Sequence, residues 1–165
     1  MRHLIAPLLL FFSATAWCDQ VVLAPDIFLH DAFGKPPAAK FLWLDDAAQQ
    51  SLKPIFGHRY PQARLRYWRT ESKTVWILED IGKEFPITAG FVVHKGVLEK
   101  ARVLTYRESR GAEIQLPAFL RQFEGQQLKE GHLSEDVDSI SGATLSVWAM
   151  QRMAKAALTL DALAP

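Results

Sequence analysis

A segment of small and hydroxyl-bearing residues precedes the most regular helical pattern of the chain, which spans residues 143–160. This segment contains Asp138, Ser139, Ser141, Gly142, Ala143 and Thr144. Ser141 or Asp138 is expected to cap the helix, because a side-chain oxygen placed there accepts from the first-turn N–H groups. A helix N-terminus flanked by small residues is also suited to binding a phosphate. The residue types are therefore consistent with a phosphate site or with an ordinary helix cap.

The helical run has one mainly polar stripe, which carries Thr144, Trp148, Gln151, Lys155 and Thr159. The other side is expected to be buried and carries Val147, Met150, Ala154, Ala157 and Leu158. Thr144 is thus expected on the accessible edge of the helix, where an enzyme could modify its hydroxyl. Trp148 is the one large apolar residue of the stripe. It is expected either to pack beside a bound cofactor or to be covered by the segment before Asp45.

The string from Asp138 to Thr144 resembles the flavinylation signature of the FMN-binding domain family, Asp-x-x-Ser/Thr-Gly-Ala-Thr. In that family the final threonine carries FMN through a phosphoester bond. Residues 106–113 are similar to the family's Glu-Ser/Thr-x-Gly segment, which lies near the flavin ring, and residues 119–125 resemble the short helix that follows. Arg110 stands where the respiratory members usually have Pro, so the local turn is expected to differ. The resemblance covers residues 85–160.

The resemblance implies FMN attached covalently to Thr144, in a protein that carries electrons. The remaining cofactor-binding residues would be Asp138, Ser139, Ser141, Gly142, Ala143, Glu108, Ser109, Arg110 and Gly111, with Trp148 added from the helical stripe. Glu108 and Arg110 are expected either to touch the flavin or to be solvent-exposed charges at a strand end. No general base or nucleophile stands out, so a carrier fits better than a stand-alone catalyst.

The implied partners are a flavin transferase that uses FAD and a divalent metal, and a redox protein or membrane electron-transport complex. The family includes subunits of the sodium-pumping NADH:quinone oxidoreductase and of the Rnf complex, which begin with a membrane helix. No such helix is expected here, which favours a free-standing carrier. The alternatives are an exported binding or scaffold module in which the Ser-Gly-Ala-Thr string is only a cap, and a non-covalent FMN binder.

Composition and charge narrow the class of protein. The 165 residues include 19 Lys and Arg against 18 Asp and Glu, a net charge of +1, so nucleic acid is not an expected partner. One cysteine excludes an internal disulfide and any multi-cysteine metal site, and no spacing of ligands predicts metal binding. The length predicts one domain.

Residues 1–18 are expected to form a cleavable signal peptide. A basic start is followed by an apolar run at residues 4–12 and by an Ala14-x-Ala16 cleavage pattern, so cleavage is expected after Ala16 or Cys18. A lipidated Cys18 is disfavoured, because Trp17 stands where a small residue is wanted. The expected location is the periplasm, with a retained N-terminal anchor as the alternative.

The remaining elements predict an α+β fold with an antiparallel sheet backed by helices. We divide the chain into the signal peptide (1–18), an N-terminal arm and helix (19–62) and an FMN-binding domain (63–162). Residues 21–40 are expected to be an extended arm, and Asp45 to cap a helix that ends near Pro54 and Gly57. Further predictions are strands at 63–70, 74–79, 87–94 and 97–107, turns at 71–73 and 95–96, a short helix at 116–123 and a polar loop at 124–139.

Overall fold

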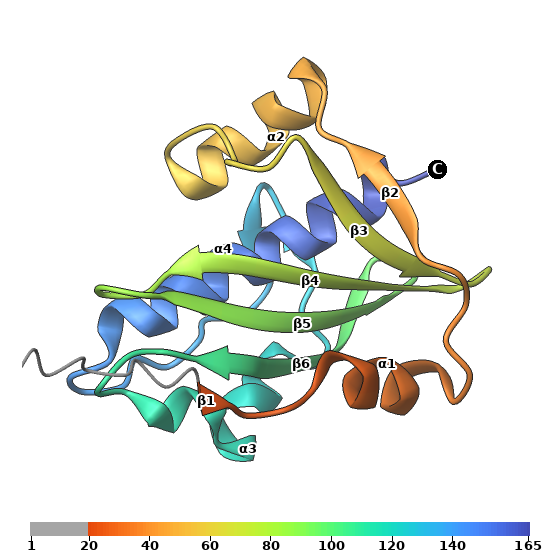
Figure 1. Cartoon of the computed structure of the whole chain (residues 1–165). Helices are drawn as coiled ribbons and strands as arrows, with labels where there is room; N and C mark the ends of the chain where they lie inside the picture. Colours follow the sequence, from red (N-terminus) through yellow and green to blue (C-terminus); the bar gives the residue numbers. More distant parts are fainter. Residues whose placement is uncertain (1–19) are drawn as a thin grey trace, which may run out of the picture.

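A six-stranded antiparallel sheet runs through the centre of the molecule, with helices on both faces (Figure 1). Its strands are β1 (Gln20–Val21), β2 (Lys40–Trp43), β3 (Arg64–Arg69), β4 (Lys73–Ile81), β5 (Pro86–His94) and β6 (Val97–Tyr106), in the order β1-β6-β5-β4-β3-β2. The structure is a computed structural model and describes residues 20–165; the expected signal peptide lies outside these residues. The α+β class, with one antiparallel sheet in a single domain, is confirmed.

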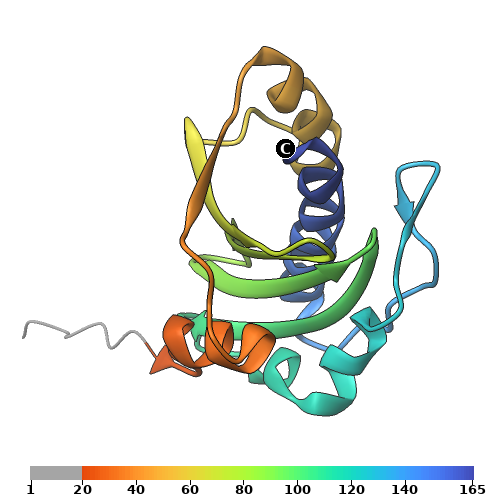
Figure 2. The same cartoon turned by 90° about the vertical axis from the view of Figure 1, so that its right-hand side faces the viewer.

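The inner face of the sheet is covered by α4 (Thr144–Leu163), which crosses it along the side that Figure 2 shows on the right. Small and sulfur-containing side chains of α4 belong to the same hydrophobic core as the buried Tyr67 and Trp76, whose rings stack with their centres 4.7 Å apart. Two polar contacts fix the helix to β4: Thr74 donates to Asp161 at 2.6 Å, and Arg152 pairs with Asp80 at 2.6 Å. The shorter α2 (Asp46–Phe56) packs beside α4.

The outer face of the sheet is covered in part by α1 (Pro25–Phe33), so the expectation of an extended arm at residues 21–40 is wrong. Phe28 is completely buried and lies directly on Gly90: a Cβ at residue 90 would be 2.3 Å from the phenyl ring. Burial of Phe28 and Leu29 stabilises this helix, whose nine residues are too few to reveal a period in the sequence.

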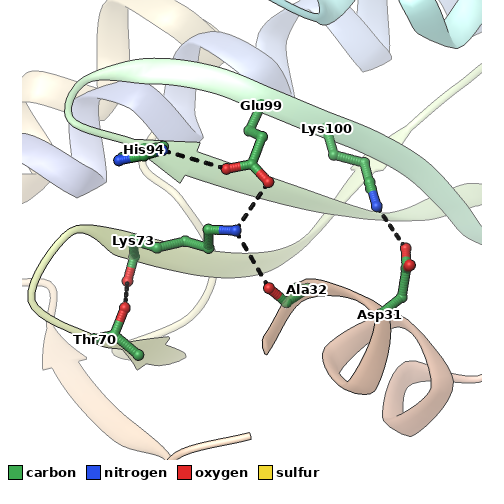
Figure 3. Close-up of polar contacts among 7 residues, drawn as sticks. All are labelled: Asp31, Ala32, Thr70, Lys73, His94, Glu99 and Lys100. Carbon is green, nitrogen blue, oxygen red and sulfur yellow. Dashed lines mark hydrogen bonds and ion pairs between the residues drawn. The ribbon is translucent and has the colours of Figure 1, made fainter. Parts of the chain in front are cut away.

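Charged side chains of the sheet hold the end of α1 in place (Figure 3). Lys100 pairs with Asp31 at 2.7 Å, and this hydrogen bond lowers the pKa of the Asp31 carboxyl. Lys73 donates to the carbonyl of Ala32 at 3.3 Å and pairs with Glu99 at 2.9 Å. Helix α1 is therefore attached to the same sheet on which α4 packs.

The four predicted strands and both predicted turns are confirmed, each strand to within two residues at its ends. Asp45 caps α2 as expected, accepting from the N–H of Ala48 at 2.8 Å. Pro54 does not end that helix, which continues to Phe56 and closes at Gly57 with a left-handed φ of 79°. β1 and β2 were not predicted, and the expected division between residues 62 and 63 falls between β2 and β3, which are neighbours in the sheet.

The region between the sheet and α4 consists of short elements. These are the 3-10 helix η1 (Ala112–Gln115), α3 (Pro117–Leu120), the 3-10 helix η2 (Arg121–Phe123), and the two-residue strands β7 (Leu128–Lys129) and β8 (His132–Leu133). The predicted helix at 116–123 is thus present as α3 and η2, and the predicted loop at 124–139 contains a small hairpin. Within residues 20–165, no helix combines the length and apolarity that a membrane crossing requires.

Candidate functional site

An open cleft of about 550 Å³ lies at the N-terminal end of α4. Three segments line it: the turn between β4 and β5, the chain after β6, and the start of α4. The lining residues are Lys83, Glu84, Glu108, Ser109, Arg110, Gly142, Ala143, Thr144, Leu145 and Ser146. Parts of the two segments singled out in the sequence, residues 108–110 and 142–144, therefore meet in one place although they lie about thirty residues apart in the chain.

A close contact between Gly111 and Ala143 joins these two segments. Gly111 has a φ of +84°, and a Cβ built on it would lie 2.7 Å from the Cβ of Ala143 and 3.0 Å from the hydroxyl of Tyr106. Only a glycine fits this backbone conformation and this approach without strain. Tyr106 adds polar contacts: its hydroxyl donates to the carbonyl of Arg110 and hydrogen-bonds to Ser146. Burial raises the pKa of Tyr106, so the phenol stays a neutral donor.

The N-terminus of α4 has no side-chain cap. The capping residue is Ala143, so the expectation that Ser141 or Asp138 caps the helix is wrong. Ala143 donates its N–H to the carbonyl of Ile140 at 2.9 Å, and the first helical hydrogen bond runs from Val147 to Ala143 at 3.0 Å. Gly142 turns the chain just before the helix with a φ of +80°, a conformation that carries Ser141 past the capping position. The N–H groups of residues 144–146 are thus left without a helical partner at the cleft.

Glu108 anchors the wall of the cleft. Its Oε1 accepts from three successive backbone N–H groups, those of Lys83 at 2.5 Å, Glu84 at 2.8 Å and Phe85 at 3.0 Å. This carboxylate is therefore neither a free charge at a strand end nor available through Oε1 to a ligand. It holds the β4–β5 turn over the cleft, which places Lys83 and Glu84 in the lining.

Two cationic side chains, Lys83 and Arg110, line the cleft at the N-terminus of α4 together with the carboxylates of Glu84 and Glu108. Arg110 is exposed in the cleft and makes no ion pair among the described residues, and Lys83 pairs only with the exposed Glu84 at 3.3 Å. The side chain of Thr144 is exposed in the same cleft, as the helical stripe predicted. Unpaired N–H groups, a guanidinium and an ammonium are together suited to bind a phosphate group.

Other predicted site residues lie outside the cleft lining. Asp138, Ser139 and Ser141 are exposed in the loop before α4, where the N–H of Asp138 donates to the amide oxygen of Gln122 at 2.7 Å. Trp148 lies one turn beyond Thr144 and is 50% exposed, so the segment before Asp45 does not bury it. The cleft is also lined by four residues that the sequence did not predict: Lys83, Glu84, Leu145 and Ser146.

Comparison with known proteins relates the segments around the cleft to one protein family. The family model described as "FMN-binding domain" matches residues 82–159, a range that contains every residue lining the cleft. A search of curated proteins returns no match. The matched range begins at the β4–β5 turn and ends within α4, so it covers all three segments that form the cleft. Residues 82–159 of this chain belong to the FMN-binding domain family.

Proposed function

We propose that this protein carries electrons through FMN joined to the hydroxyl of Thr144 by a phosphoester bond. The observation that carries the proposal is the position of Thr144: an exposed hydroxyl in the first residue of a helix without a side-chain cap, inside the cleft that also contains residues 108–110. An ester at this hydroxyl would place the phosphate beside the free N–H groups of the helix and near Arg110.

The size and chemistry of the cleft support FMN as the ligand. Its volume of about 550 Å³ lies within the range of small-molecule sites, and Gly142 has open space where a side chain would otherwise stand. When bound, FMN supplies the redox chemistry. The protein's residues bind and orient it: the start of α4 and Arg110 for the phosphate, and the segment around Ser109 for the rest of the molecule.

Attachment requires a second enzyme, for which Thr144 is the substrate. A flavin transferase using FAD would form the bond between Thr144 Oγ1 and the FMN phosphorus. The phosphoanhydride bond to AMP breaks, AMP leaves with that bond's electron pair, and the hydroxyl proton is released. The exposure of Thr144 supports access by such an enzyme.

A carrier fits the cleft better than a stand-alone catalyst. Both carboxylates of the lining already have partners, Glu84 with Lys83 and Glu108 with the turn N–H groups. The oxidant and reductant would then be other proteins, either a redox protein or a membrane electron-transport complex. We place this exchange in the periplasm, which predicts a mature chain beginning at Trp17 or Asp19 in N-terminal sequencing.

Intact mass of the protein from a host that contains the transferase tests the proposal. We expect an increase equal to FMN minus one water, absent from Thr144→Val and retained in the matched control Thr159→Val, further along the same helix. Flavin that co-purifies but leaves on denaturation would show non-covalent binding. Colourless protein of unmodified mass would show a binding or scaffold module, and either result would overturn the covalent assignment.

A further inference from the structure

An exposed group of aromatic and basic side chains lies at one edge of the sheet, on the edge strand β2 and its neighbour β3. Phe41 and Trp43 on β2 are 46% and 64% exposed, and Arg64 and Arg66 on β3 are exposed beside them. We call these four residues the β2–β3 surface. They lie on the face of the sheet away from α4, because Leu65 and Tyr67, with the opposite parity, belong to the main core. The surface is also outside the family match at residues 82–159.

The guanidinium groups of this surface lie over the aromatic rings. The Arg64 guanidinium is 4.5 Å from the centre of the Phe41 ring and 5.5 Å from that of Trp43, and Arg66 is 5.8 Å from Phe41. Neither arginine forms an ion pair with a carboxylate among residues 20–165. The rings therefore hold two cations at the exposed surface, and those cations pair with no carboxylate within the described chain.

The backbone of β2 is free on the side away from β3. Leu44 donates its N–H to the carbonyl of Ala63 at 2.9 Å, and this bond fixes which residues of β2 face β3. In an antiparallel ladder, successive residues direct their backbone N–H and C=O groups alternately toward the partner strand and away from it. The backbone groups of Leu42 therefore face β3, while those of Phe41 and Trp43 point outward. β2 is the last strand of the sheet, so these groups have no strand partner in the described part of the chain.

This edge lies far from the Thr144 cleft. Figure 1 shows β2 near the C-terminal end of α4, and Arg69 at the end of β3 donates to the carbonyl of Ala164 at 2.9 Å. The cleft is at the other end of α4, which at 20 residues is about 30 Å long. A molecule bound at the β2–β3 surface would leave the cleft open.

We propose that the β2–β3 surface docks an acidic, extended segment of a partner polypeptide, which adds to the free edge of β2 as a further strand. Its backbone would pair with Phe41 and Trp43, and its carboxylates, on alternate residues, would meet Arg64 and Arg66. A partner held by this segment would stay attached to the protein while another part of the partner, which bears its redox group, reaches the cleft. Lipid fits less well, because guanidinium groups cover the ring faces and a lipid headgroup offers no strand to pair with β2.

The test titrates the full secreted chain with a short capped peptide of alternating Glu and Val and follows backbone amide resonances. We expect saturable shifts at Phe41 and Trp43 that weaken at high ionic strength, and no such shifts with a peptide of alternating Lys and Val. Arg64→Ala with Arg66→Ala should weaken binding about tenfold. The matched pair Arg121→Ala with Lys129→Ala, which removes two exposed cations elsewhere, should leave binding unchanged.

Three results would overturn the proposal: no saturable shift at β2, equal binding of the Lys–Val peptide, or unchanged affinity in the Arg64 and Arg66 variant. Binding of phosphatidylglycerol vesicles in place of the peptide would identify a membrane surface and also refute it. Both arginines are exposed, so their replacement should leave the amide spectrum of the core intact. The titration needs no flavin, so its outcome is independent of the assignment of Thr144.

Discussion

The contact between Gly111 and Ala143 yields the sharpest test of how the cleft is built. Gly111→Ala should destabilise the protein in two ways, because residue 111 has a φ of +84° and the new Cβ would lie 2.7 Å from that of Ala143. The left-handed φ costs a non-glycine residue about 1–2 kcal/mol. Overlap inside a packed contact adds about 1–3 kcal/mol. The expected loss in the free energy of unfolding is the sum of these, about 2–5 kcal/mol.

Gly125→Ala separates the two contributions. Gly125 has nearly the same φ, +83°, but a Cβ there would meet nothing within 4 Å. Its replacement should therefore show the backbone contribution alone, about 1–2 kcal/mol. Any change in the unfolded chain from Gly to Ala is common to both variants and cancels in their difference. That difference measures the overlap of the new methyl group with Ala143 and with the Tyr106 hydroxyl.

Removing the opposing methyl group should rescue the first variant. In Gly111→Ala with Ala143→Gly the shortest overlap is removed and only the contact with the Tyr106 hydroxyl remains, so the loss should fall toward the Gly125→Ala value. Urea unfolding of the four proteins gives the free energies, and flavin incorporation by the transferase reports whether the cleft has kept its shape. Equal losses for Gly111→Ala and Gly125→Ala, or a double variant no more stable than Gly111→Ala, would refute the reasoning.

Three other residues give further predictions. Glu108→Ala should cost about 2–4 kcal/mol in urea unfolding and Glu108→Gln about 1, because the amide keeps an acceptor for the turn; equal losses would contradict an anchoring role. Arg152→Met should cost about 3 kcal/mol near pH 8 and less near pH 5. Burial already raises the pKa of Asp80, and loss of Arg152 raises it further, so protonation at low pH relieves the penalty; a loss independent of pH would contradict this. Trp148→Leu should brighten flavin emission and shift the visible band if the indole stacks on the flavin, with little loss of stability because Trp148 is 50% exposed; an unchanged flavin spectrum would exclude stacking.

The elements that the sequence predicted well are those with a strong local pattern. β4 to β6 alternate apolar and polar residues or form continuous apolar runs, and the Lys95-Gly96 turn between β5 and β6 has the residues a tight hairpin favours. β2 was missed because two of its four residues, Phe41 and Trp43, are apolar but exposed, so no buried face appears in the sequence. α1 was missed because only Phe28 and Leu29 are buried, and their partner is a distant strand.

In the site as well, residues within a local sequence motif were predicted, whereas residues placed by contacts with distant parts of the chain were not. Residues 108–110 and 142–144 were found because the family signature is local, and the structure brings both segments into the cleft. Lys83 and Glu84 were not found, because their place depends on the carboxylate of Glu108 reaching the turn 24 or 25 residues earlier. The cap was misassigned because a serine next to a helix start usually caps it, whereas here the left-handed Gly142 moves that serine away.

Gly142 and Ala143 each have a structural role in the Ser-Gly-Ala-Thr string. Gly142 supplies the positive φ that turns the chain into the helix, and Ala143 is small enough to lie against Gly111. Alanine is a poor capping residue, so the helix forgoes about 1 kcal/mol that serine would contribute at that place. A serine oxygen there would also occupy the N–H groups that face the cleft. In the proposed function the phosphate on Thr144 binds those groups instead, so the ligand completes the cap that the sequence omits, and α4 should be more stable with flavin attached than without it.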